Sequence, residues 1–284
     1  MAISLFVFGV AVGSFLNVLR VRYDPEKFIL NKNIIGGRSV CPKCRNTLRW
    51  FELVPVVSFV LQAGRCRHCG GKISPLYPIV EIVMGLIFVF VPFGLTPVFG
   101  VPSPLFYALS LLWILVGVAL FLMALIDAKT NLIPNEIVFL LVVLGILIAA
   151  LSGSRFGYTE GSFAGHYAFL LGIRENIWLN RLFASAVSAL FFGFVIAVTR
   201  GRAMGMGDAK LAFALGMVFG WPDVLLVVAV AFILGALFGL GAILLRKKTM
   251  RGTVPFGPFL AIASFLVFFF GFEIVDFYFK LFNI

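Results

Sequence analysis

Long apolar runs separated by short polar turns dominate this chain of 284 residues. A run of about 20 apolar residues is long enough to cross a bilayer as a helix. The pattern predicts an all-α polytopic membrane protein with about eight transmembrane helices. The sixth segment is as short as a half-span, but it is predicted to cross the membrane, because otherwise Arg246, Lys247, Lys248 and Arg251 would lie outside. The eight segments lie at about 2–19, 78–96, 103–126, 133–151, 177–199, 206–220, 222–245 and 255–279.

One polar stretch, residues 20–77, is as long as a small domain. The predicted organisation is a first transmembrane helix at 1–19, a cytoplasmic domain at 20–77 and a seven-helix membrane domain at 78–284. The first apolar run has no basic residue before it and no small-residue cleavage site, so we interpret it as a retained helix rather than a cleaved signal. A second polar stretch, 152–176, carries no recognisable motif.

Composition and charge narrow the class of protein and indicate an orientation. Hydrophobic residues make up 62% of the chain and charged residues 12%, which excludes an ordinary soluble globule. If residue 1 lies outside, the loops predicted to lie inside (20–77, 127–132, 200–210 and 246–254) hold 19 of the 23 Lys and Arg residues. Basic residues favour the cytoplasmic side, so both termini are predicted to lie outside. The basic residues that set this orientation account for the net charge of +11, so no nucleic-acid partner is expected.

Two aspartates occur where apolar runs meet polar turns, Asp127 in FLMALIDAKTNLIPN and Asp208 in RAMGMGDAKL. Ionisable groups at membrane depth are costly and are usually functional. Both fall at the predicted cytoplasmic face, where two carboxylates can meet and share one proton, as aspartic proteases require. Gly205 and Gly207 leave room for a peptide backbone beside Asp208. The sequence therefore predicts a catalytic pair of Asp127 and Asp208.

Other interpretations of the two aspartates remain open at this point. Taken singly, Asp127 is equally well a solvated helix-end residue and Asp208 an N-terminal helix cap. A proton- or cation-coupled transporter would use both as relay groups, although transporters place such groups near the bilayer midplane. A zinc-stabilised membrane scaffold without chemistry is a third hypothesis. Lys129 and Lys210, two residues from each aspartate, are interpreted as interfacial anchors.

All four cysteines lie in 20–77, as the pairs Cys41–Cys44 and Cys66–Cys69. Two CxxC pairs are typical of a four-thiolate zinc site, in which each pair supplies two tetrahedral ligands. Gly70 and Gly71, which follow the second pair, suit the tight backbone turn that such a site requires. Two disulfides are the alternative, which a reducing cytoplasm disfavours. Because the stretch has few large apolar residues, the metal is expected to stabilise its fold.

The remaining ionisable residues are less informative. Glu81 lies at the start of the second apolar segment, where the helix dipole favours a negative charge. Asp24, Glu26 and Glu52 are predicted to be solvated loop residues, and His68 a surface residue rather than a fifth ligand.

Several motifs, in this order, resemble the type IV prepilin peptidase family, and the resemblance covers most of the chain. Besides the cysteine pairs and the two aspartates, they are Gly13-Ser14-Phe15-Leu16-Asn17, Glu52-Leu53-Val54-Pro55, Ile73-Ser74-Pro75-Leu76-Tyr77-Pro78 with Glu81, Ile133-Pro134-Asn135, Gly205-Met206-Gly207-Asp208 and Pro255-Phe256-Gly257-Pro258-Phe259. The Gly-x-Gly-Asp element alone also occurs in presenilin-like intramembrane proteases. Asn135 departs from the family pattern, since many members carry Asp there.

The resemblance implies a bifunctional enzyme of the bacterial inner membrane. Such an enzyme cleaves the short basic leader of prepilins or pseudopilins at the cytoplasmic face, after a Gly, and N-methylates the new terminus with S-adenosylmethionine. Asp127 and Asp208 fall on the family's catalytic aspartates, and Cys41, Cys44, Cys66 and Cys69 on its zinc ligands. The methyltransferase activity is implied for 20–77, where no glycine-rich nucleotide loop identifies the cofactor-binding residues.

Overall fold

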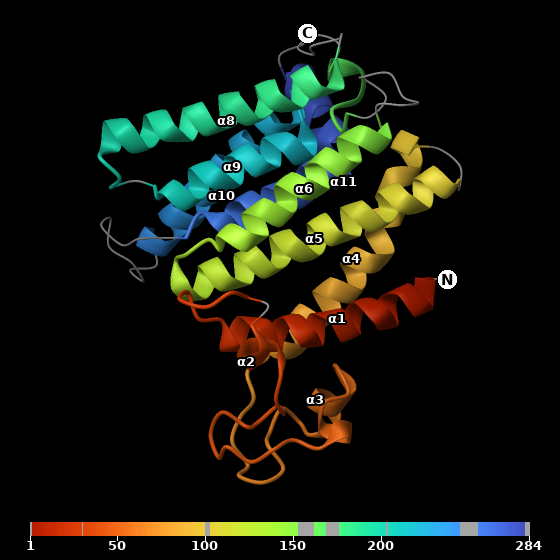
Figure 1. Cartoon of the computed structure of the whole chain (residues 1–284), viewed down its shortest axis with the longest axis vertical. Coiled ribbons are helices and arrows are strands. Elements are labelled where there is room, and N and C mark those ends of the chain that lie inside the picture. The colour runs from red at the N-terminus through yellow and green to blue at the C-terminus, as the bar shows by residue number, and fades with distance from the viewer. Residues whose placement is uncertain are drawn as a thin grey trace. The chain divides into compact units, whose positions relative to one another are not determined.

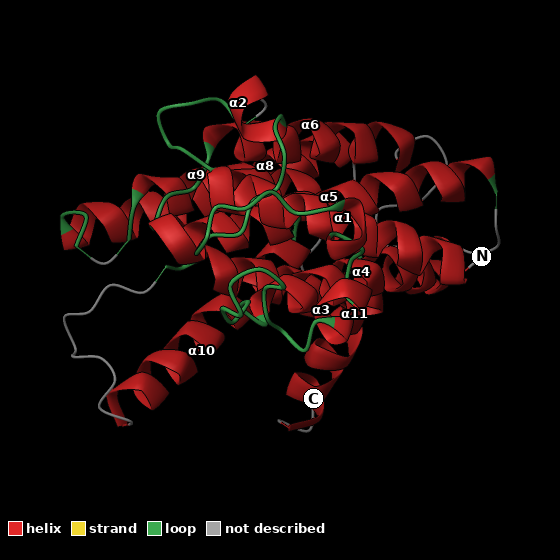
Figure 2. Ribbon diagram, turned by 90° about the horizontal axis from the view of Figure 1, so that it is seen from below, coloured by secondary structure: helices red, strands yellow, loops and turns green. Residues whose placement is uncertain are grey.

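The structure is a computed structural model, which describes residues 2–29, 31–99, 103–152, 162–168, 176–202, 204–244 and 255–281. The chain forms two compact units, Met1–Phe93 and Gly94–Ile284. Within the described residues the regular elements are helices, joined by loops and two isolated β-bridges (Figure 2). The predicted all-α architecture is confirmed.

Seven of the described helices are long and apolar enough to cross a membrane. The chain is therefore a multi-pass membrane protein. The seven are α1 (Ala2–Arg22), α4 (Leu76–Phe99), α5 (Pro104–Thr130), α6 (Asn135–Ser152), α8 (Ile177–Thr199), α10 (Asp223–Leu244) and α11 (Gly257–Leu281). The sixth predicted segment forms α9 (Met206–Phe219), whose 14 residues extend for about 21 Å at the rise of an α-helix.

In the first unit, α1 packs directly on the beginning of α4. A Cβ atom on Gly13 would lie 2.7 Å from Glu81 Cα, so glycine is required for the two backbones to approach this closely. Between the two helices the chain forms short helices at Lys32–Ile35 (α2), Trp50–Glu52 (η1) and Val57–Leu61 (α3), joined by long loops (Figure 1). This loop-rich segment carries all four cysteines.

In the second unit, α9 lies between α8 and α6 (Figure 1). A Cβ atom on Gly216 would lie 2.5 Å from Ser185 Cα, which shows how closely α9 approaches α8. The Ser188 hydroxyl group donates to the Ala212 carbonyl group at 2.9 Å across the same interface. Most residues of α9 from Ala209 onward are buried. This helix is therefore a central element of the unit despite its length.

The two ends of α9 lie beside opposite ends of α8. Arg200 ends α8 in the left-handed conformation (φ 51°), and a short turn leads into Met206. At the other end, the buried Arg181 in the first turns of α8 donates to the carbonyl groups of Met217 and Val218. The helix therefore runs antiparallel to α8 along most of its length.

Part of the predicted outer loop is held against the second unit. Both carboxylate oxygens of the buried Asp223 accept hydrogen bonds from this segment, from the Ser162 hydroxyl group at 2.7 Å and the Phe163 N–H at 3.1 Å. Phe163 packs edge-on against Trp113. Six of the basic residues used for the orientation argument lie outside the described residues, namely Arg155, Arg174, Arg246, Lys247, Lys248 and Arg251.

Candidate functional site

Asp127 lies in the last turn of α5 and is almost fully buried, with 3% of its surface exposed. The helix extends one turn beyond residue 126, where the apolar segment was predicted to end. It ends at Asn131, which has the left-handed conformation and donates its N–H to the Asp127 carbonyl group at 2.8 Å. Lys129 is exposed, on another face of the helix, as predicted. The carboxyl group of Asp127 thus points into the protein at the end of a helix.

The partner of this carboxyl group is Gly257, at the start of α11. Its N–H donates to Asp127 Oδ2 at 2.9 Å. A Cβ atom on residue 257 would lie 2.6 Å from the same oxygen and 2.9 Å from Met123 Sδ, so a larger residue would displace these side chains. Sequence reasoning gave Gly257 no role, since the two residues are 130 positions apart. The feature of the sequence that could have indicated a role for Gly257 is the Pro-Phe-Gly-Pro-Phe motif, because a helix does not by itself require a glycine.

Asp208 lies in the first turn of α9 and is half-buried. Its Oδ2 accepts the Gly205 N–H at 3.1 Å, and its own N–H donates to the Gly205 carbonyl group at 3.1 Å. The helix dipole favours a carboxylate at this end. Open space lies beside Gly205, where a Cβ atom would meet no atom closer than 3.9 Å. Asp208 is thus anchored by local hydrogen bonds beside a backbone that a substrate can approach.

The segments that carry the two aspartates contact each other. A Cβ atom on Gly207 would lie 3.2 Å from the Ile133 side chain, which is in the turn after α5. Lys210 Nζ donates to Asn135 Oδ1 at 3.0 Å, at the start of α6. Packing thus brings together two elements that are separated by some 80 residues in the sequence.

A pair of carboxyl groups in such surroundings suits acid–base chemistry. One group can take a proton from water while the other donates a hydrogen bond to a carbonyl oxygen. The two aspartates differ in setting, since Asp127 is buried and accepts from a distant segment, whereas Asp208 is half-buried and accepts from its own turn. In known pairs of catalytic carboxyl groups, such a difference in environment determines which group acts as the acid and which as the base.

The two cysteine pairs form matching turns in the first unit. In the first, Cys41 N–H donates to the Asn46 carbonyl group and Arg45 N–H to the Cys41 carbonyl group, each at 2.9 Å. In the second, Cys66 N–H donates to Gly71 and Gly70 N–H to Cys66, again at 2.9 Å. Arg45 and Gly70 hold the corresponding left-handed positions, at φ 58° and 65°. The turn predicted at Gly70 is confirmed, and Arg45 occupies the equivalent position in the first turn.

The cysteine sulfurs are arranged as a zinc ion requires. The four Sγ atoms lie within 4.8 Å of one another, and Cys41 Sγ is 4.0 Å from Cys69 Sγ. Tetrahedral Zn–S bonds of about 2.3 Å place neighbouring sulfurs about 3.8 Å apart. The N–H of Cys44 donates to Cys41 and lowers the pKa of that thiol to about 7, which favours the thiolate that binds metal. The residues present therefore fit a structural zinc ion.

Two carboxyl groups of the first unit are buried. The prediction of a solvated Glu52 is wrong: its surface is 8% exposed, and its Oε2 accepts the Arg49 N–H at 2.8 Å. Glu81 is 7% exposed, and its Oε2 accepts the Val56 N–H at 2.7 Å. The prediction for Glu52 rested on position in the sequence and could not include burial by segments that fold back, whereas Glu81 lies near the N-terminal end of its helix, as predicted. His68 is exposed, as predicted.

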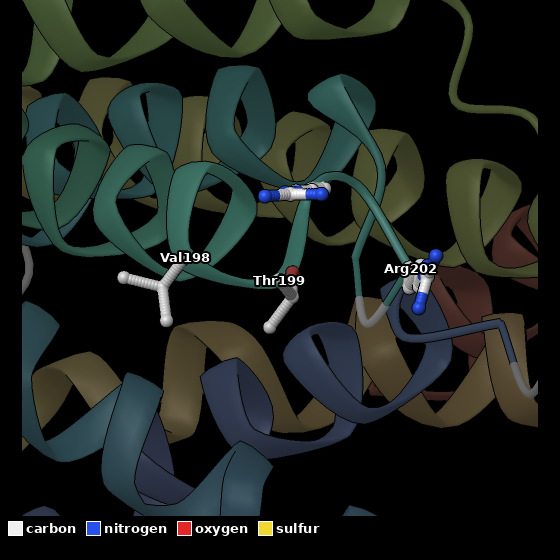
Figure 3. A pocket seen from close by; sticks show the side chains of 4 residues that line it. Val198, Thr199 and Arg202 are labelled. Carbon is white, nitrogen blue, oxygen red and sulfur yellow. The ribbon is translucent and has the colours of Figure 1, made fainter.

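A shallow hollow of about 500 Å³ lies at the end of α8 and is lined by Val198, Thr199, Arg200 and Arg202 (Figure 3). Both arginines are exposed. They belong to the turn that precedes Gly205 and Asp208 in the chain. This surface is open and basic, as expected for a loop predicted to face the cytoplasm.

Two family descriptions match the chain, the bacterial peptidase A24 N-terminal domain over residues 7–94 and the type IV leader peptidase family over residues 113–240. Among similar proteins, the prepilin leader peptidase/N-methyltransferase of Bacillus subtilis is 33% identical, covering 98% of this chain and 97% of its own length. Proteins with the same name from Aeromonas salmonicida (31%; 96% and 92%) and Pseudomonas aeruginosa (30%; 95% and 90%) are also similar. No solved structure gives a significant match.

Proposed function

Because this chain belongs to the type IV leader peptidase family, we propose that it is a membrane aspartic endopeptidase that removes the leader of type IV prepilins or pseudopilins and then N-methylates the new terminus. One observation carries the peptidase assignment. The start of α9, which carries Asp208, contacts the turn that follows α5 and the start of α6, and Asp127 lies in the last turn of α5 just before that turn.

The proposed cleavage uses Asp127 and Asp208 as a pair that holds one proton. The ionised carboxylate takes a proton from water, and the resulting hydroxide attacks the carbonyl carbon of the scissile peptide bond. The protonated carboxyl group donates its hydrogen bond, and then its proton, to the carbonyl oxygen. When the intermediate breaks down, the leaving amine receives a proton from the pair.

The surroundings of the aspartates support this chemistry. Gly257 holds Asp127 Oδ2 from one side and fixes the orientation of the carboxyl group, since its N–H and the close fit around it leave little freedom. The open backbone at Gly205 allows an extended peptide to approach Asp208. A pair buried in the middle of the bilayer would suit a transporter, whereas these carboxyl groups lie in the terminal turns of their helices.

The proposed orientation places both aspartates at the cytoplasmic face. A prepilin is an apolar helix whose basic leader stays inside, so its scissile bond lies at the inner surface of the membrane. The basic turn at Arg200 and Arg202 precedes Asp208 directly and favours the same side. The cytoplasmic domain has an excess of positive charge and does not attract a basic leader by its overall charge.

The proposed methylation assigns a second reaction to the first unit. S-adenosylmethionine would supply an electrophilic methyl group to the new terminal amine, which would lose a proton while S-adenosylhomocysteine leaves as the thioether. The proposed zinc ion, held by Cys41, Cys44, Cys66 and Cys69, stabilises the loops of this unit and is not given a chemical role.

Both reactions can be tested in one incubation. Purified protein is mixed with a synthetic prepilin and S-adenosylmethionine, and the products are weighed by mass spectrometry. We expect the leader as one product and the shortened chain with one added methyl group as the other. An intact prepilin after incubation with folded enzyme would contradict the peptidase assignment. Cation flux into vesicles that depends on Asp127 and Asp208 would favour the transporter instead.

A further inference from the structure

Most of the motifs that the peptidase site does not use meet at one cavity of the first unit. The cavity measures about 480 Å³, which is within the usual range for small-molecule sites. Its wall takes residues from α1, both cysteine turns, η1, α3 and the start of α4. The side chains on which the inference rests are Ser14, Asn17, Glu52, Phe59, Tyr77 and Glu81. Segments that are distant in the sequence thus line one cavity that is partly open to solvent.

Asn17 lines this cavity and carries an unused acceptor. The residue is 2% exposed, and its Nδ2 donates to the Tyr77 carbonyl group at 3.1 Å, which fixes the orientation of the amide. Its Oδ1 is buried and has no hydrogen-bond partner among the described residues. A buried amide oxygen is nearly always paired, so this one indicates a donor that the chain itself does not supply.

The cavity also holds buried negative charge. Glu52 and Glu81 are each anchored through Oε2 to a backbone N–H, and the Ser14 side chain interacts with Glu81. The donor to Glu81 is Val56, whose φ of 60° is rare for a β-branched residue. Such backbone outliers concentrate at ligand-binding sites, where the surrounding contacts maintain them.

Two basic residues, Arg22 and Lys72, line the cavity, but neither neutralises the carboxylates in its interior. Arg22 directs its guanidinium group to the carbonyl groups of Ile34, Gly36 and Arg38, and Lys72 is exposed at the rim. The interior therefore favours a ligand that carries positive charge and hydrogen-bond donors. Phe59 and Tyr77 add aromatic surface, which suits a flat ring or a cation.

We propose that this cavity binds S-adenosylmethionine, with Asn17 Oδ1 accepting from an amino group of the ligand and with Glu52 and Glu81 facing its positive charges. The proposal rests on the methyltransferase half of the proposed function. The ligand combines a sulfonium cation, an ammonium group and a flat adenine ring, which match the carboxylates, the amide oxygen and the aromatic wall. Because Cys41 and Cys66 also line the cavity, the metal centre shapes its wall.

Binding, rather than turnover, gives the sharper test. The full-length protein in detergent is titrated with S-adenosylmethionine and separately with S-adenosylhomocysteine, which has a neutral sulfur. We expect Asn17→Leu and Glu81→Gln each to weaken S-adenosylmethionine binding at least tenfold. Glu81→Gln should also reduce the preference for the charged ligand over the neutral one. The matched control is Glu26→Gln, which removes an exposed carboxylate of the same unit and should bind as the wild type does.

The outcomes separate the two proposals. Zinc content and thermal unfolding show whether each variant is folded, and Glu81→Gln preserves shape if Asn17→Leu does not fold. If wild-type protein binds the ligand and both folded variants bind it equally well, the cavity assignment is wrong while the proposed function stands. If wild-type protein cleaves prepilin but neither binds nor uses the ligand, the methyltransferase half of the function fails. Displacement of the ligand by a basic leader peptide would mean that the cavity holds substrate instead.

Discussion

The two candidate centres of this protein are built in opposite ways. The metal centre forms from turns of six residues, in which each CxxC pair folds back on its own backbone and places two sulfurs. The aspartate site forms from segments that are far apart in the chain, since Asp127 depends on Gly257 and the start of α9 contacts the turn after α5. The first centre is a local property of sequence, and the second is a property of helix packing.

This difference predicts different failures. Loss of a metal ligand should unfold a small loop-rich segment, because metal binding contributes folding free energy to a segment with so little regular structure. Loss of a packing contact at the aspartate site should leave a folded protein with misplaced carboxyl groups, because the surrounding helices are long and apolar.

The largest effect is expected from replacing Cys41 and Cys44 together by Ser. The zinc content should fall to background and residues 20–77 should become sensitive to protease, since two of four ligands are lost. Metal analysis and limited proteolysis measure this result. Replacing the exposed His68 by Ser is the control and should leave both unchanged. Full metal retention by the double variant would contradict the four-cysteine site.

The next largest effect is expected from Gly257→Ala. The added Cβ atom would lie 2.6 Å from Asp127 Oδ2, so the carboxyl group must move. A shift of about 1 Å in a catalytic group lowers rates by roughly 10²-fold, which a prepilin cleavage assay would detect. Gly193→Ala is the matched control, because a Cβ atom there meets nothing within 4 Å. Equal cleavage by the two variants would show that the contact with Gly257 does not position Asp127.

A smaller effect, on stability rather than activity, is expected from Arg181→Met. The change removes the donor to the carbonyl groups of Met217 and Val218 and the positive charge that acts on the buried Asp223. Breaking one side of such a buried arrangement costs about 3 kcal/mol. Thermal unfolding in detergent, with the exposed Arg202→Met as control, measures the loss. An unchanged unfolding temperature would mean that the contacts of Arg181 do not stabilise α9 against α8.

The smallest effect is expected from Lys210→Met. Its hydrogen bond to Asn135 is exposed, so its loss should lower the free energy of the local contact by about 1 kcal/mol or less. We expect cleavage to fall by about threefold, measured as kcat/KM on a synthetic prepilin. A loss as large as that of Gly257→Ala would show that Lys210 acts on the reaction itself.

What the sequence predicted follows the same division between local and distant contacts. The apolar segments, the cysteine turns and the exposure of His68 depend on local pattern and were predicted correctly. The burial of Glu52 and the partner of Asp127 were not, because both depend on segments that approach from elsewhere in the chain. The end of α5 was placed at 126, since the apolar run stops there, whereas Asn131 sets the observed end.

The central claim, that Asp127 and Asp208 act as one pair, is tested most directly by a double-mutant cycle of prepilin cleavage. Asp127→Asn, Asp208→Asn and the double variant are compared with wild type, with Asp276→Asn as a control from the same unit. Residues that act as a unit give non-additive losses, so each single variant should lose at least about 10²-fold and the double variant little more. Near-wild-type cleavage by either single variant, or losses that simply multiply, would contradict the shared mechanism.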